Sequence, residues 1–318
     1  MVKLWGQKFK KEKEDEGKTA KEWFDLGFSE KDPEKKKECY SKVEELDSTG
    51  VYLYYFMGGH SYIQKNYEEA IKYSDKALEI DPKFTHAWLL KGRALKDSDK
   101  YREAIGCFDK ALKVNSNFAA VWYNKGGALL RLGRYEECLE CFDKAINLDP
   151  TQDEPWYSKG VLLGLLGRHE EALGCFDKAI ELNPEFVEAW LDKGIALSML
   201  GRYQAIEYFE KAIELNPKYT EAWYHEFAFL AKMGLYDKAL EYLDKAIEIN
   251  SEWVLEYSDK VTALRPNNAL PWSCKGWVFK KVGKYEEALS CFNRALEIEP
   301  NFEFAKKGKK GCIRGKGL

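Results

Sequence analysis

A tryptophan recurs along the middle of this 318-residue chain at a fixed interval of 34 residues. The interval separates Trp88, Trp122, Trp156 and Trp190, and Trp223 follows after a further 33 residues. A fixed period of this length is the signature of a structural unit that is repeated along the chain. We therefore expect no single central core, because each unit of such a chain packs mainly on its neighbours.

Other positions of the unit are also constant when its aromatic residue is numbered as position 4. Position 8 is usually glycine, position 20 is small and position 24 is usually phenylalanine. Apolar residues three and four positions apart share one face of a helix, and glycine or alanine lets a second helix approach closely. Each unit is therefore predicted to be a pair of antiparallel helices. Position 27 is alanine in all seven aligned units, namely Ala77, Ala111, Ala145, Ala179, Ala212, Ala246 and Ala295.

The order Trp-x3-Gly, Ala-x3-Phe-x2-Ala and Pro within 34 residues resembles the tetratricopeptide-repeat (TPR) family, as a prokaryotic- or archaeal-type array. The resemblance covers residues 20 to 300. It implies an all-α fold, a TPR solenoid in which antiparallel helix pairs form a right-handed superhelix. It implies no particular cellular process, because the family supplies scaffolds to many of them.

The repeat divides the chain into six segments. Both ends depart from the pattern, and one internal unit is incomplete. The predicted segments are a charged N-terminal stretch over 1–19, a degenerate repeat over 20–50, six repeats over 51–251, a truncated repeat over 252–268, one repeat over 269–300, and a basic C-terminal cap and tail over 301–318.

The truncated repeat lacks the 19 residues of a first helix and its turn. No proline or glycine lies between Tyr236 and Leu264, and apolar residues continue across the junction in steps of three and four. These features predict one long helix over 236–264, whose exposed half is a candidate surface for self-association or a hinge. The alternative is two helices with a break at residues 250–252, where Ser251 would act as the N-cap of the second helix.

Composition argues against several functions. The 50 Lys and Arg residues against 53 Asp and Glu give a formal net charge of −3, without the basic excess of a nucleic-acid binder. Cys138 and Cys141 form a Cys-x-x-Cys, but no second pair of Cys or His completes four metal ligands. The four histidines lie in different repeats and form no catalytic motif. We expect no enzyme, metal or cofactor, and, since no segment is apolar enough for a signal peptide or membrane span, a cytoplasmic location without membrane contact.

The resemblance implies that the first helices of the repeats line a concave groove. Position 5 of these helices is Tyr or Leu in consecutive units, a row of side chains suited to a peptide contact. Glu154, Glu188, Glu221 and Asp192 make the middle of the groove acidic, which favours a partner segment with Lys or Arg beside apolar anchors. The predicted contact residues are Tyr55, Leu89, Arg93, Tyr123, Asn124, Tyr157, Val161, Leu191, Asp192, Ile195 and Tyr224.

Two functions of different classes remain. One is a protein-interaction scaffold that binds a peptide or protein segment in the concave groove. The other is an RNA-binding helical-repeat protein, because helix-pair repeats of similar length read bases one per unit. The near-neutral charge and the acidic groove favour the scaffold. The family's clamp for a C-terminal carboxylate is not expected, because Leu89, Val161 and Leu165 stand where it needs polar or basic residues.

Overall fold

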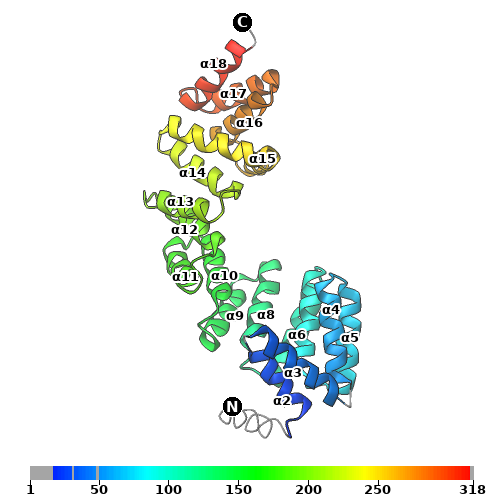
Figure 1. Ribbon diagram of the computed structural model, residues 1–318. Coiled ribbons are helices and arrows are strands. Elements are labelled where there is room, and N and C mark those ends of the chain that lie inside the picture. The colour runs from blue at the N-terminus through cyan, green and yellow to red at the C-terminus, as the bar shows by residue number, and fades with distance from the viewer. Residues whose placement is uncertain (1–16, 31, 48–49, 316–318) are drawn as a thin grey trace, which may run out of the picture. The chain divides into compact units, whose positions relative to one another are not determined.

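The computed structural model describes residues 17–30, 32–47 and 50–315, and every regular element within these ranges is a helix. Most of the charged stretch predicted over 1–19, and the last three residues of the predicted tail, lie outside them. The chain divides into two compact units, with the boundary between Pro150 and Thr151. Each unit is described by itself below, with the helices labelled in Figure 1.

The first unit consists of successive helix pairs. Each pair packs as a hairpin, and within the main array the second helix of one pair contacts the first helix of the next. The helices are α2 (Ala20–Ser29), α3 (Pro33–Leu46), α4 (Val51–Ile63), α5 (Tyr67–Ile80), α6 (Thr85–Asp97), α7 (Tyr101–Val114), α8 (Ala119–Arg131) and α9 (Tyr135–Leu148).

The second unit continues the pattern of hairpins and ends with an additional helix that packs on the last pair. Its helices are α10 (Asp153–Leu165), α11 (His169–Leu182), α12 (Val187–Met199), α13 (Ala205–Leu215), α14 (Thr220–Lys232), α15 (Tyr236–Leu264), α16 (Ala269–Lys281), α17 (Tyr285–Ile298) and α18 (Glu303–Gly315).

Glycine at position 8 is the point of closest approach between the two helices of a pair. A Cβ atom on Gly160 of α10 would lie 2.7 Å from Cε1 of Phe176, the position 24 residue of α11. Real Cβ atoms do not approach a ring this closely, so only glycine fits without a shift of the ring. The predicted close contact is confirmed and recurs between Gly126 and Phe142, Gly194 and Phe209, and Gly276 and Phe292.

An ion pair that the sequence patterns did not reveal links successive repeats. Lysine at position 7 of a first helix pairs with aspartate at position 25 of the preceding second helix. The lysines are less exposed than the aspartates, so they lie with their stems along the helix interface. The pairs are Lys91 with Asp75 at 2.6 Å, Lys125 with Asp109 at 2.7 Å, Lys193 with Asp177, and Lys275 with Asp259 at 2.5 Å.

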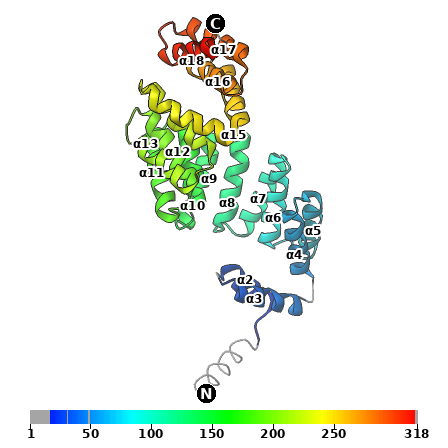
Figure 2. The same cartoon turned by 45° about the horizontal axis from the view of Figure 1, so that its top comes forward.

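Helix α15 is interrupted at Asn250, and Figure 2 shows the chain changing direction within it. Asn250 has φ −157° and ψ 86°, outside the helical region, and its side-chain oxygen accepts a hydrogen bond from the Trp253 amide at 2.9 Å. The uninterrupted helix predicted over 236–264 is therefore wrong. The alternative of two helices is correct, with Asn250 rather than Ser251 as the N-cap. We call residues 251–264 α15b.

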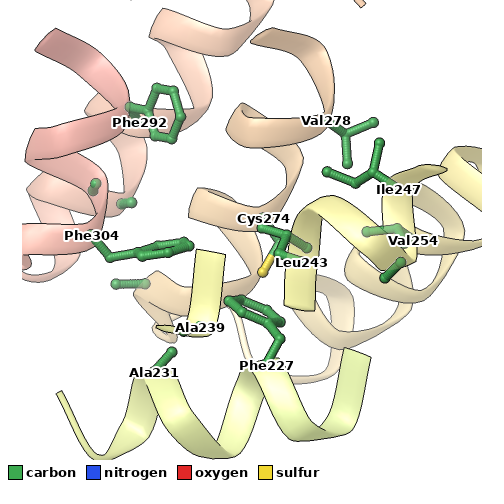
Figure 3. Close-up of a cluster of buried hydrophobic side chains, with 14 of the residues drawn as sticks. Phe227, Ala231, Ala239, Leu243, Ile247, Val254, Cys274, Val278, Phe292 and Phe304 are labelled. Carbon is green, nitrogen blue, oxygen red and sulfur yellow. The ribbon is translucent and has the colours of Figure 1, made fainter. Parts of the chain in front are cut away.

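The break allows α15b to enter the core of the second unit. Val254, Ser258 and Thr262 are buried, and Val254 belongs to the same apolar cluster as Leu243 from before the break and Cys274 of α16 (Figure 3). The α15b segment is thus held on one face by α14 and α16. Its outer face carries Leu264, which is 82% exposed.

Candidate functional site

The predicted contact residues are divided between the two units, and the structure places them in different surroundings. In the first unit, the Tyr55 ring packs at 5.4 Å from that of Phe24, within a dense aromatic cluster. The exposed Arg93 guanidinium lies over the ring of Tyr62 at 4.7 Å. Tyr123 packs against Phe142 at 5.9 Å, and Asn124 accepts a hydrogen bond from Lys96 at 3.3 Å. Leu89 is buried.

The expected exposed row at position 5 is wrong at three of its six residues. Leu89, Leu191 and Tyr224 are buried in the core. Tyr224 is only 4% exposed because Trp253 and Tyr257 of α15b cover it, with ring centroids 5.6 and 5.0 Å away. These three residues contribute to packing and are not available to a partner.

Tyr157 and Asp192 form a polar pair between α10 and α12 of the second unit. The Tyr157 hydroxyl donates to Oδ2 of Asp192 at 2.8 Å, and the Tyr157 ring packs on Phe186 with centroids 4.6 Å apart. Burial raises the pKa of Asp192 to about 6, with the tyrosine hydroxyl opposing the rise and the Glu188 carboxylate adding to it. The pair therefore presents a carboxylate that is poorly solvated and poorly compensated at neutral pH.

Three carboxylates gather at this place, and we call Glu188, Asp192 and Glu221 the acidic cluster. Burial raises the pKa of the Tyr219 phenol, and the charges of all three carboxylates raise it further, which shows that they share one neighbourhood. No lysine or arginine among residues 50–315 forms an ion pair with any of them. The cluster is thus an uncompensated negative patch on the first helices α12 and α14.

A hollow of about 760 Å³ lies further along the same two helices, and we call it the α15b groove. Its lining includes Ile195, which was among the predicted contact residues, and Met199, which is 52% exposed. The sequence patterns did not reveal this groove, since its wall exists only because α15 breaks at Asn250. The lining residues are Ile195, Ser198 and Met199 of α12, His225, Ala228, Phe229, Ala231 and Lys232 of α14, Tyr236, Tyr257, Val261, Leu264 and Arg265, with Asn268, Leu270, Glu299 and Phe302 at its far end.

A second hollow, of about 700 Å³, lies in the first unit. The buried rings of Phe24 and Phe84 line it together with His86, and charged residues such as Lys83 and Asp81 also line it. Burial lowers the pKa of His86 to about 4, so the ring is neutral at pH 7. None of the predicted contact residues lines it, because the degenerate helix α2 gives no regular pattern from which the cluster could be anticipated.

The cysteines and the possible metal-ligating side chains are described for residues 17–30, 32–47 and 50–315. No group of three His, Cys, Asp or Glu side chains there is placed to hold a metal ion. All eight cysteines are buried free thiols, and burial raises the pKa of Cys138 to about 12. The described helices include none that is long and apolar enough to cross a membrane.

Family comparison agrees with this architecture. Models described as tetratricopeptide repeat match residues 52–84, 85–118, 119–152, 154–186, 175–208, 204–264 and 269–302. The chain therefore belongs to the tetratricopeptide-repeat family, and its fold is an all-α TPR solenoid. Members of this family are typically non-catalytic protein-interaction scaffolds.

Solved structures similar to this chain include other TPR proteins, and those with TM-scores above 0.5 have the same fold. A tetratricopeptide repeat protein from Parabacteroides merdae has a TM-score of 0.57 at 19% identity, covering 83% of this chain and 99% of its own. The pilF protein of Pseudomonas aeruginosa has a TM-score of 0.54 at 19% identity, covering 70% of this chain and 95% of its own. YrrB, a TPR protein described as having an unusual peptide-binding site, is 28% identical with a TM-score of 0.49, over 56% of this chain and 93% of its own. No curated protein sequence matched the chain.

Proposed function

We propose that the chain is a scaffold that binds a segment of another protein on the first helices of its repeats, and that this segment carries Lys or Arg beside apolar side chains. The observation that carries the proposal is the acidic cluster of the second unit, in which three carboxylates have no basic partner among the described residues. A cationic side chain is the group that this patch lacks.

The energetics of Asp192 support a basic ligand. A carboxyl group whose pKa is raised by burial is costly to ionise, and a nearby positive charge lowers that cost. The Tyr157 hydroxyl donates a hydrogen bond to Oδ2 of Asp192 and so fixes the orientation of the carboxylate. In this orientation the carboxylate can accept further hydrogen bonds. The arrangement favours an arginine or lysine over a neutral side chain.

The other predicted contact residues whose side chains are accessible lie in both units. In the second unit, Val161 and Ile195 are accessible apolar side chains beside the cluster's helices and are proposed to contact the apolar anchors of the ligand. In the first unit, the predicted contact residues that are at least partly accessible are Tyr55, Arg93, Tyr123 and Asn124. That they form a contact surface of that unit stays a prediction.

The electrostatic character of the second unit disfavours the RNA-binding alternative. RNA binding needs basic side chains that displace counterions from phosphates. The acidic cluster would instead repel a phosphate backbone, and the chain as a whole carries a formal net charge of −3.

Affinity purification from the native host, combined with crosslinking mass spectrometry, tests the proposal. Wild type is compared with a cluster variant, Glu188→Gln/Asp192→Asn/Glu221→Gln. The matched control, Glu171→Gln/Glu181→Gln/Glu214→Gln, removes the same number of charges from second helices, where each glutamate pairs with a basic neighbour. We expect proteins captured by wild type to survive ribonuclease treatment, to persist with the control and to be lost with the cluster variant. Capture that depends on RNA, or that the cluster variant leaves unchanged, contradicts the proposal.

A further inference from the structure

The α15b segment is the second helix of a repeat whose first helix is missing. Its residues Tyr257-Ser258-Asp259-Lys260 occupy the places of Cys-Phe-Asp-Lys in complete repeats. Asp259 also forms the ion pair with Lys275 that joins a second helix to the next repeat. The α15b segment therefore packs on α16, the first helix of the next repeat, as the second helix of a complete unit does. The side of α15b that the first helix of its own unit would cover has no such helix.

Position 27 of α15b shows what is left uncovered. In the seven complete repeats this position is an alanine no more than 1% exposed, as at Ala212 and Ala246. In α15b the residue is Val261, which is larger, is only partly buried and lines the α15b groove together with Leu264. The groove thus exposes an apolar face that the repeat normally buries against another helix.

The shape of the groove suits a helix. Ser198, Ala228 and Ala231 line it with small side chains, beside which two helices can approach to the usual packing distance of about 8 to 10 Å. Met199 of α12 and Leu264 of α15b line the groove as large exposed apolar side chains. A ridge of apolar side chains from an incoming helix would fit between them.

Charge distinguishes the two ends of the groove's helices. The acidic cluster lies toward the N-terminal ends of α12 and α14, at Glu188 and Glu221. Lys232 and Arg265 lie at the opposite end and form no ion pair among the described residues, with Glu299 as the one carboxylate lining that end. The complementary ligand is negative at one end and positive at the other.

We propose that the α15b groove binds an amphipathic helix of a partner protein, with acidic residues in its first turn, basic residues in its last turn, and an orientation antiparallel to α14. The apolar face of this helix covers Val261, Leu264 and Met199, as a first helix covers the second helix in a complete repeat. Its acidic first turn meets Lys232 and Arg265, and its basic last turn meets the acidic cluster. Such a helix is also favoured by its own dipole, which stabilises acids at the N-terminus and bases at the C-terminus. The inference rests on the proposed function and specifies its ligand.

Two synthetic peptides of equal composition test the orientation. Each has about 15 residues, enough for ~22 Å of helix, with leucines at helical spacing. One carries Glu in its first turn and Lys in its last, the other carries the reverse, and a hydrocarbon staple gives both the same helicity. Fluorescence anisotropy with the full chain is expected to show about tenfold tighter binding of the acid-first peptide, since two charged contacts become favourable instead of repulsive. Equal affinities, or no binding of the acid-first peptide, overturn the proposal.

Two variants locate the binding. Ala228→Arg places a large side chain in the groove, and Leu264→Glu changes a side chain so exposed that folding does not depend on it. Ala263→Arg is the matched control, because Ala263 is exposed on α15b and does not line the groove. We expect the first two to weaken the acid-first peptide about tenfold or more and the control to leave it unchanged. Peptide binding that Leu264→Glu does not weaken overturns the proposal.

Two further outcomes identify other occupants. If wild type forms dimers in sedimentation velocity and Leu264→Glu makes them monomers, the groove holds a second copy of this chain and the partner helix is rejected. If native proteins are lost with the acidic-cluster variant but retained by Ala228→Arg and Leu264→Glu, the proposed function stands and the helix in the groove is rejected.

Discussion

Gly160 on α10 lies so close to the Phe176 ring on α11 that a Cβ atom at the glycine would stand 2.7 Å from Cε1 of that ring. The same helix carries a second glycine one turn later. A Cβ atom at Gly164 would meet nothing within 4 Å. The two glycines therefore have the same intrinsic helix propensity, but only Gly160 is tightly packed. They form a matched pair of positions for testing the packing by substitution.

Gly160→Ala should destabilise the protein and Gly164→Ala should stabilise it. Both substitutions gain up to about 1 kcal/mol of helix propensity. At Gly160 the added methyl group displaces a fully packed ring, which costs roughly 1 to 3 kcal/mol and outweighs the gain, and Gly160→Leu costs more. Thermal and urea denaturation measure both. Stabilisation by Gly160→Ala would show that the ring shifts at no cost, against the packing described above.

Glu226 on α14 occupies the position at which other repeats place the lysine of the inter-repeat ion pair. It is fully buried, and the residue at position 25 of the preceding helix is Glu210, so two acids stand where Lys193 and Asp177 stand one repeat earlier. Burial raises the pKa of Glu226 to about 7 and the Glu210 charge adds to this, whereas Tyr242 and Lys238 oppose it. The junction between α13 and α14 is therefore sensitive to pH.

Glu226→Gln should stabilise the protein above pH 7. The folded pKa of about 7 exceeds the unfolded value of 4.5, so the folded state binds more protons between these values and loses stability as pH rises through this window. Removing the carboxyl group should increase the free energy of unfolding by about 1 to 3 kcal/mol at pH 8 and have little effect at pH 4.5. Urea denaturation across pH 4.5 to 8 tests this, with the exposed Glu241→Gln as the control. A gain that does not depend on pH would assign the effect to packing rather than to charge.

The period of 34 residues predicted the helix pairs correctly because its constant residues, such as Gly160 and Ala179, are those at which two backbones come closest. These contacts form within one helix pair or between neighbouring helix pairs, so they recur wherever the sequence repeat recurs. The burial of Tyr224 could not be read in this way, since the helix that covers it arises from a break outside the repeat. The sequence did not decide between an unbroken helix and a break at residues 250–252, because apolar residues keep their spacing of three and four across Asn250. The structure shows the break, where the Asn250 side chain accepts a hydrogen bond from the Trp253 amide.

Tyr157→Phe should destabilise the protein at neutral pH and have a smaller effect in acid. The substitution removes the hydroxyl that donates to Asp192, and a hydrogen bond to a charged acceptor contributes about 1.5 to 3 kcal/mol. Burial raises the pKa of Asp192 from its ordinary value of 3.8 to about 6, so the carboxyl group is charged at pH 7.5 and protonated at pH 4.5. Urea denaturation at both pH values measures the difference, with the exposed Tyr203→Phe as the control. An equal loss at both values would mean that the carboxylate charge does not strengthen this bond.

Asn250→Ala should loosen the start of α15b, and Ser251→Ala should not. The Asn250 side chain accepts a hydrogen bond from the Trp253 amide at 2.9 Å, in the geometry of an N-cap, while its own backbone is extended at φ −157°. Loss of such a cap costs about 1 kcal/mol of stability. Alanine also lacks the side-chain oxygen that competes with backbone carbonyls for the Trp253 amide. Hydrogen exchange should therefore speed up at the Trp253 amide in Asn250→Ala and remain unchanged in Ser251→Ala. Ser251 is the residue that the two-helix alternative from the sequence had offered as the cap. Because α15b forms one wall of the groove, the acid-first peptide should bind Asn250→Ala more weakly than wild type although no lining residue has changed. Equal protection of Trp253 in both variants would show that packing of Val254 and Ser258 alone holds the break in place.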